Sequence, residues 1–329
     1  MRNVVAGLML LLCAAAVFSL HAGLTFYSTG TVWSALTGDS GVEALIITTL
    51  RLPRTLIGIV AGASLGLSGL LMQYVTRNPL AEPGLLGVNA GAALCVTLGI
   101  YFFGFSSLFH IGAFATLGAI GTTAIVFYLS AVSGGVGKPA TTLMAGFTIA
   151  ALLGSFTQTL LLIDETALET LLFWISGSFA DRPLDLLVFG IPMLLVGALG
   201  ALFLSSSLDV LRMDDSSASS VGVNVRFARL TGLLLAALLS AGSVAMAGPI
   251  LFLGLAAPHM ARLLLRNHQP SATGLIFVTL LIGALIAVSA DILARVIVAP
   301  GEAPMSAVLA LIGVPLLIHL LRQKRGFAQ

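Results

Sequence analysis

The stretch RLPRTLIGIVAGASLGLSGLLMQYVTRNPLAEPGLLGVNAG, residues 51–91, contains one long uncharged run with a polar turn at each end. No charged residue occurs from Thr55 to Val75. A helix over this run would be about 30 Å long at 1.5 Å per residue, which matches the hydrocarbon core of a bilayer. The turns before and after it contain prolines, which favour helix ends. The sequence therefore predicts a membrane-spanning helix here.

Four glycines recur within this run, at Gly58, Gly62, Gly66 and Gly69. Spacings of four and three residues place them on one face of a helix. Small residues on one face allow the backbone of a second helix to approach closely in a membrane. We therefore expect this glycine face to pack against another helix.

The composition of the whole chain is that of a membrane protein. Hydrophobic residues make up 58% and charged residues only 9% of the 329 residues, with a mean hydropathy of +1.09. So few polar residues cannot cover a soluble globule of this length. The net charge of +2 gives no basic tail that would suggest nucleic-acid binding.

Hydropathy predicts an all-α polytopic protein with about ten transmembrane helices and no separate domain within residues 1–329. The first run, behind Arg2, could be a signal peptide, but it exceeds the usual length of a signal core and is better interpreted as a span. The expected spans are 4–24, 55–75, 85–104, 109–131, 140–163, 186–206, 228–247, 249–265, 274–292 and 304–321.

Basic residues indicate the orientation of these spans. If ten spans alternate from a cytoplasmic N-terminus, eleven of the 15 basic residues lie inside and only Arg51, Arg54, Arg182 and Arg295 lie outside. The positive-inside rule favours this arrangement, with both termini in the cytoplasm. The three outer cations Arg51, Arg54 and Arg295 could bind an anionic partner or lipid headgroups.

Two polar segments interrupt the apolar runs. Residues 164–185 fit either an external amphipathic segment, with Phe173 and Trp174 at headgroup level, or a distorted start of the next span. Residues 205–229 form the longest polar stretch and are expected in the cytoplasm, with Asp214 and Asp215 suited to a helix N-terminus.

Several blocks of sequence occur in an order that closely resembles the FecCD family. The first blocks are RLPR, GASLGLSG and QYVTRNPLAEPGLLG, and the later ones are GPILFLGLAAPHMAR (248–262), ADILAR (290–295), PGEAP (300–304) and LIGVP (311–315). Members of this family are permeases of ABC importers for iron siderophores, haem and cobalamin. The resemblance extends over nearly all of the chain.

The resemblance implies a type II ABC importer permease in the bacterial cytoplasmic (inner) membrane. It implies a second permease subunit, identical or homologous, two ATP-binding cassette ATPase subunits and a periplasmic or surface substrate-binding protein. In the family, arginines matching Arg51, Arg54 and Arg295 pair with glutamates of the binding protein. The family's contact with the ATPase corresponds here to Asp214, Asp215, Ala218 and Gly222.

The sequence carries little sign of catalytic or cofactor chemistry. Lys138 follows a glycine-rich run, but Pro139 stands where a phosphate-binding loop needs Ser or Thr, so ATP hydrolysis is expected on a separate subunit. The five histidines show no metal-binding spacing, and we expect no metal or other cofactor. Asp291 is the one carboxylate expected within a span, and its spacing from Arg295 favours an i,i+4 ion pair.

The favoured interpretation is a permease subunit for an iron(III)-siderophore chelate. The alternatives within the family are haem or cobalamin import. Two alternatives belong to other classes: an ion-coupled secondary transporter and a polytopic membrane enzyme. The scarcity of acidic residues within the spans disfavours the secondary transporter.

Overall fold

The computed structural model describes residues 1–134, 138–163, 165–213, 215–266, 270–297 and 303–311, together with 313 and 315. Within these ranges the regular structure is helical and contains no strand. The long helices are α1 (Arg2–His21), α4 (Leu52–Thr76), α5 (Val88–Phe103), α6 (Leu108–Val132), α7 (Pro139–Leu161), α9 (Leu187–Phe203), α12 (Val225–Ala247) and α14 (Ala272–Ile297).

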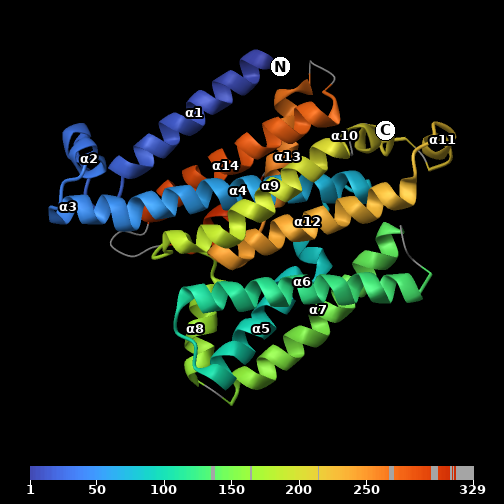
Figure 1. Ribbon diagram of the computed structural model, residues 1–329, viewed down its shortest axis with the longest axis horizontal. Coiled ribbons are helices and arrows are strands. Elements are labelled where there is room, and N and C mark those ends of the chain that lie inside the picture. The colour runs from blue at the N-terminus through green and yellow to red at the C-terminus, as the bar shows by residue number, and fades with distance from the viewer. Residues whose placement is uncertain are drawn as a thin grey trace.

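Short helices connect the long ones. They are α2 (Thr29–Leu36), α3 (Val42–Leu45), α8 (Glu165–Ile175), α10 (Ser205–Val210), α11 (Asp215–Ser220) and α13 (Leu253–Leu264). A π-helical turn, Ile46–Arg51, joins α3 to α4, and 3-10 turns at Pro83–Leu86 and Leu184–Leu186 precede α5 and α9. Figure 1 shows α2 and α3 at one end of the long helices and α10 and α11 at the opposite end.

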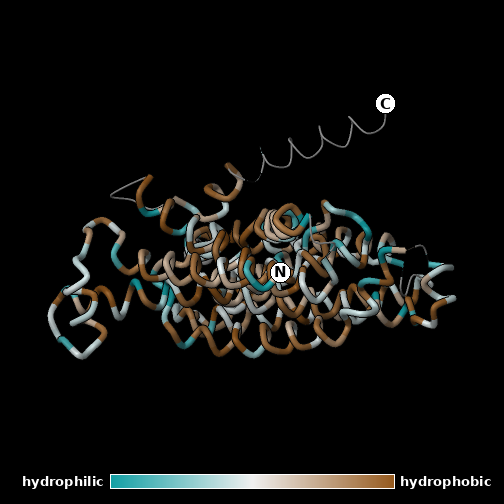
Figure 2. The backbone as a smooth tube through the Cα atoms, turned by 90° about the horizontal axis from the view of Figure 1, so that it is seen from above, coloured by the Kyte–Doolittle hydropathy of each residue, from teal (hydrophilic) through white to brown (hydrophobic). Residues whose placement is uncertain are grey.

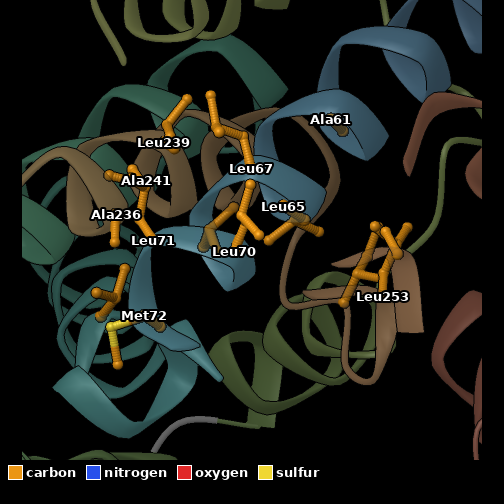
Figure 3. Packing of buried hydrophobic residues seen from close by; sticks show 14 of the residues in the cluster. Ala61, Leu65, Leu67, Leu70, Leu71, Met72, Ala236, Leu239, Ala241 and Leu253 are labelled. Carbon is orange, nitrogen blue, oxygen red and sulfur yellow. The ribbon is translucent and has the colours of Figure 1, made fainter. Parts of the chain in front are cut away.

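Helix α4, which forms from the first predicted span, is the centre of the molecule. It packs against α14, α12, α13 and α9, and most of its residues are buried. Figure 3 shows Leu67, Leu70 and Leu71 of α4 among side chains of α12 such as Leu239. Pro53 follows the π-helical turn within one continuous helical stretch, Val42–Thr76, so the polar turn expected before this span is itself helical. Arg77 ends α4 with φ of 51°.

Helices α5, α6, α7 and α8 form a second group beside this centre (Figure 1). Helix α7 is mostly exposed and carries large apolar side chains on its surface, at Met144, Phe147, Leu152 and Phe156. Figure 2 shows hydrophobic residues predominating along the long helices, with hydrophilic ones nearer the two ends. Such an apolar lateral surface suits contact with lipid or with another membrane subunit.

Seven helices of the described part are long and apolar enough to cross a membrane: Arg2–His21, Val42–Thr76, Leu108–Val132, Pro139–Leu161, Leu184–Phe203, Val225–Ala247 and Ala272–Ile297. The run predicted at 85–104 forms the shorter apolar helix α5. Most of the run at 304–321 lies outside the described residues.

The run predicted as a full span at 249–265 is instead a helix of 12 residues, α13. Gly248 ends α12 with φ of 72°, Pro249 follows, and Phe252 adopts φ of 66°. This non-helical backbone takes up the first part of the run. A helix of 12 residues is about 18 Å long, which is too short to cross a bilayer.

Residues 165–175 form a helix, as an amphipathic segment requires, but the expected position of one aromatic residue was wrong. Phe173 is 54% exposed, whereas Trp174 is 1% exposed and belongs to the hydrophobic core. The backbone carbonyl of Trp174 lies close to Gly248, so the end of α8 packs directly against the end of α12.

The four glycines of α4 face other helices. A Cβ added at Gly62 would lie 2.5 Å from both the Ala287 Cβ and the Gly283 carbonyl oxygen of α14. Gly66 lies against the same helix. An added Cβ at Gly58 would lie 3.8 Å from Val288 of α14 and 3.4 Å from the ring of Phe179 in the loop after α8. At Gly69 an added Cβ would overlap the carbonyl oxygen of Gly254 in α13.

Candidate functional site

A buried cluster of charges lies at the end of the bundle that carries Arg51, here called the arginine end. Asp291 of α14 accepts a hydrogen bond from Arg54 Nε on Oδ1 at 2.7 Å. Its Oδ2 accepts from Arg295 Nε at 3.1 Å and also from Arg295 Nη2. Arg295 Nη1 donates to the carbonyl oxygen of Ser19 in α1 at 3.0 Å. The expected Asp291–Arg295 pair is therefore present, and it joins three helices.

Arg51 binds the backbone that follows α1 rather than a carboxylate. Its Nη1 donates to the carbonyl oxygens of Leu20 and His21 at 2.9 and 2.8 Å, and its Nη2 donates to that of Thr25 at 2.7 Å. The guanidinium also lies 4.4 Å from the ring centroid of Tyr27, a cation–π distance. Leu20 and His21 form the end of α1, where carbonyl oxygens lack partners within the helix, and the His21 carbonyl oxygen also accepts from the Tyr27 backbone N–H at 3.1 Å.

The three arginines expected as external cations are buried and do not project from the surface. Arg51, Arg54 and Arg295 are 7, 8 and 6% exposed. They line one wall of a cavity of about 400 Å³, together with Leu50 and Asp181. An anionic group could therefore reach their charge through this cavity, while the side chains themselves stay fixed by internal hydrogen bonds.

At the opposite end, here called the α11 end, Asp215 connects the polar segment to the core helices. Its carboxylate accepts from Arg229 of α12 at 2.9 and 2.7 Å, in a bidentate pair. It also lies 2.8 Å from Arg77, the residue that ends α4. Because Asp215 begins α11, these pairs fix this short helix to both α4 and α12.

The other residues expected in this segment differ in position. Ala218 is fully buried. Gly222 has φ of 86°, a left-handed conformation that favours glycine, and no atom would contact an added Cβ. Asp214 lies outside the described residues. The segment between α9 and α12 thus forms two short helices, α10 and α11. Asp215 begins α11, as expected, whereas α10 has no side-chain cap.

The largest described cavity, about 760 Å³, lies beside α5, α7 and α8. Its wall is mostly apolar and has no charged residue among those described; its polar members are Asn89, Thr157, Gln158, Ser176 and Ser306. Helix α13 begins near this cavity, since Pro249 and Leu251 line it. No group of three or more His, Cys, Asp or Glu side chains that could hold a metal ion occurs in the described residues.

Glu82 holds the start of α13 in place. Its Oε1 accepts a hydrogen bond from the backbone N–H of Phe252 at 2.8 Å. Burial raises the pKa of this carboxyl group above its usual value, and the Phe252 hydrogen bond opposes the rise. Glu82 lies in the turn that follows α4, so one end of α4 is coupled to the broken segment before α13.

Some of these residues carried no signal in the sequence. The residues around Glu82 and Arg229 do not indicate their partners, Phe252 and Asp215, because these lie in other segments of the chain. Nothing in the sequence around Asp181 indicates the cavity that it lines. The block QYVTRNPLAEPGLLG contains Glu82, but its role depends on contact with Phe252, 170 residues later.

Comparison with known proteins agrees with this arrangement. The sequence profile of the FecCD transport family matches residues 10–323. The ferric enterobactin transport system permease protein FepD of Escherichia coli is 42% identical over 98% of this chain and 96% of its own length. The Fe(3+)-citrate import system permease protein YfmD of Bacillus subtilis is 40% identical over 88% of this chain and 84% of its own.

A solved structure described as an inward-facing metal-chelate type ABC transporter matches with a TM-score of 0.86 and 32% identity. The match covers 98% of this chain and 100% of that one. A profile match over almost the full chain, with full-length relatives above 30% identity, establishes membership. The chain therefore belongs to the FecCD transport family and is a membrane-spanning transport permease of that family.

Proposed function

We propose that this chain is the permease subunit of an ATP-driven importer that moves an iron(III)-siderophore chelate across the cytoplasmic membrane. The observation that carries the proposal is the 42% identity to the ferric enterobactin permease over 98% of the chain. A Fe(3+)-citrate permease and a siderophore permease from Bacillus subtilis are also similar over most of the chain. Three similar permeases thus share iron chelates as cargo class.

The character of the largest cavity supports an intact chelate as the cargo. Its mostly apolar wall lacks charged residues in the described part of the chain. Free Fe³⁺ would need several convergent oxygen, nitrogen or sulfur ligands, whereas a chelate brings its own ligands and presents their outer surface. We place the pathway along this cavity, with exposed α7 facing a second permease subunit, either identical or homologous.

The proposed orientation puts the arginine end outside and the α11 end in the cytoplasm, with both termini inside. This follows the distribution of basic residues. Glutamates of a substrate-binding protein would then approach the cavity lined by Arg51, Arg54 and Arg295. Complementary charge at such a surface speeds association and fixes the orientation of docking.

The segment around α11 would contact the ATPase subunits. A displacement of α11 would be transmitted by the ion pairs of Asp215 to Arg77 at the end of α4 and to Arg229 of α12. Closure of the ATPase pair on binding ATP would move these helices as bodies and switch the pathway from outward-open to inward-open. Hydrolysis itself belongs to the partner subunit.

Haem is the second candidate cargo, because the hemin transport system permease protein HmuU of Yersinia pestis is 36% identical over 97% of this chain. Uptake by cells that express the complete importer distinguishes the candidates. We expect ⁵⁵Fe-labelled siderophore to accumulate and labelled haem not to. Accumulation of haem alone would replace the siderophore proposal.

A pull-down of the tagged chain in mild detergent tests the assembly. We expect an ATPase subunit to co-purify, with ATPase activity in the eluate, and the copy number of this chain distinguishes a homodimer from a heterodimer. Recovery of the chain alone, with uptake that survives ATP depletion but needs the proton-motive force, would favour an ion-coupled secondary transporter instead.

A further inference from the structure

A second basic cavity lies at the α11 end, beside the segment proposed to contact the ATPase, because Arg212 precedes α11 and Arg77 pairs with Asp215. It has a volume of about 460 Å³ and is lined by Gln73, Tyr74, Arg77, Arg212 and Arg262, with Leu275 and two prolines. Its walls come from the ends of α4 and α13, the start of α14 and the turn after α10. Three guanidinium groups thus converge on one cavity.

One side chain in this cavity has a donor without a partner. Gln73 is 5% exposed, its Oε1 accepts a hydrogen bond from Arg262 Nη2, and its Nε2 has no hydrogen-bond partner. Since the amide oxygen is already used by a cation, the remaining group is a donor. A buried unpaired donor costs free energy unless a ligand or water accepts from it.

The carboxylates nearby do not neutralise all three arginines. Arg212 lies 3.3 Å from Asp209, whose carboxylate also accepts from the backbone N–H of Ala272 at 2.9 Å. Arg77 shares Asp215 with another arginine. For Arg262, no carboxylate lies within ion-pair distance in the described part of the chain, and Gln73 is neutral.

We propose that this cavity binds a phosphate-class anion, held by Arg262, Arg212 and the Gln73 Nε2 donor. Guanidinium groups form strong charge-assisted hydrogen bonds with phosphate oxygens. The source that fits best is the headgroup of an anionic phospholipid. Exposed apolar side chains on α13 and α14, which also line the cavity, would contact the acyl chains of the lipid. These side chains are Leu263 and Leu264 of α13 and Phe277 of α14.

The proposed binding of an anion in this cavity does not depend on which cargo the permease transports. Its assignment to the inner leaflet rests on the proposed orientation. A headgroup at this place would join α4, α13 and α14, the helices that carry Gln73, Arg262 and Leu275. The site would therefore stabilise the packing of the α11 end.

Native mass spectrometry of the full chain, purified in neutral detergent and stripped of lipid, tests the proposal with defined probes. We expect phosphatidylglycerol to bind more tightly than phosphatidylcholine. Arg262→Gln and Gln73→Glu should each weaken phosphatidylglycerol binding by about tenfold. Arg226→Gln, which removes one exposed charge outside this cavity, is the matched control and should leave binding unchanged.

Gln73→Glu provides a second variant if Arg262→Gln folds poorly, because a glutamate beside Arg262 keeps the side-chain size. Inorganic phosphate, added at constant ionic strength, identifies the source of the anion. Displacement of phosphatidylglycerol by millimolar phosphate, with loss in both variants, would support the anion site but assign it to soluble phosphate. Equal phosphatidylglycerol binding by wild type and both variants would overturn the proposal and leave the cavity to a partner protein.

Discussion

Arg54 in α4 donates a hydrogen bond from Nε to Asp291 in α14 at 2.7 Å, across 237 residues of sequence. Asp291 also pairs with Arg295, and all three residues are at most 8% exposed. One carboxylate thus holds two buried guanidinium groups. Removal of one partner of a buried pair leaves an uncompensated charge, which is more costly than the pair itself is favourable.

The variant Asp291→Asn should therefore be strongly destabilised. We expect a loss of about 3–5 kcal/mol, because Arg54 and Arg295 lose their shared counter-charge within the bundle. Thermal unfolding of the purified chain in detergent would measure this as a lower Tm, with a lower folded yield. Asp39→Asn, at an exposed position, is the control and should unfold like the wild type. Equal stability of the two variants would contradict the role of Asp291.

The burial of Arg54 and Arg295 changes the way in which docking can be tested. Substitution of either by Glu would disrupt the internal network, so weaker docking would not be informative. Leu50 lines the same cavity and is 47% exposed. We expect Leu50→Glu to weaken affinity for the binding protein at low salt while the arginine network stays intact.

Leu45→Glu serves as the matched control for docking, since Leu45 is 54% exposed and does not line the cavity. Binding measured by surface plasmon resonance on permease in nanodiscs should fall mainly through the association rate. If Leu50→Glu and Leu45→Glu bind the binding protein equally well, the cavity is not the docking site.

Asp215→Asn should uncouple transport from ATP hydrolysis. The change removes the charge that pairs with Arg229 and Arg77, so α11 loses about 1–3 kcal/mol of attachment to α4 and α12. In proteoliposomes with the ATPase subunits, we expect fewer chelates transported per ATP hydrolysed. Arg226→Gln, an exposed change in the first turn of α12, should keep the wild-type ratio. An unchanged ratio in Asp215→Asn would argue against this connection.

Gly69→Ala should destabilise the packing of α4 against α13. The added methyl group would overlap the Gly254 carbonyl oxygen, and overpacking of this kind costs about 1–3 kcal/mol. Gly121→Ala in α6 is the control, since nothing lies within 4 Å of an added Cβ there. That control should unfold at the wild-type temperature or slightly above it. A similar Tm for the two variants would show that α13 can move away freely.

The stability of the chain should depend on pH through Glu82. Burial raises the pKa of Glu82 in the folded chain above the usual value of 4.5, so the folded state binds the proton more tightly than the unfolded state. Stability should therefore fall as pH rises from about 4.5 through the raised pKa, and level off above it. Glu82→Gln keeps an oxygen acceptor for Phe252 and should remove this part of the pH dependence. A Tm profile from pH 4 to 8 that is identical in wild type and variant would contradict this role.

The sequence by itself determined the class of the protein and much of its helix order. Long uncharged runs can be satisfied in a bilayer only by helices, so hydropathy predicted the spans that became α1, α4, α6, α7, α9, α12 and α14. The spacing of the two residues also predicted the Asp291–Arg295 pair, because residues four apart on a helix are neighbours in any context. The ordered sequence blocks indicated the family.

Only the tertiary structure decided which polar groups from distant parts of the chain meet. Arg54 reaches Asp291, Glu82 reaches Phe252 and Gln73 reaches Arg262 across long separations that no local spacing encodes. Hydropathy also failed at 249–265, since an average over a window cannot detect that Gly248 and Phe252 adopt positive φ angles. Local periodicity reports the surroundings of one helix face, whereas burial of Trp174 or Arg54 depends on which helix covers that face.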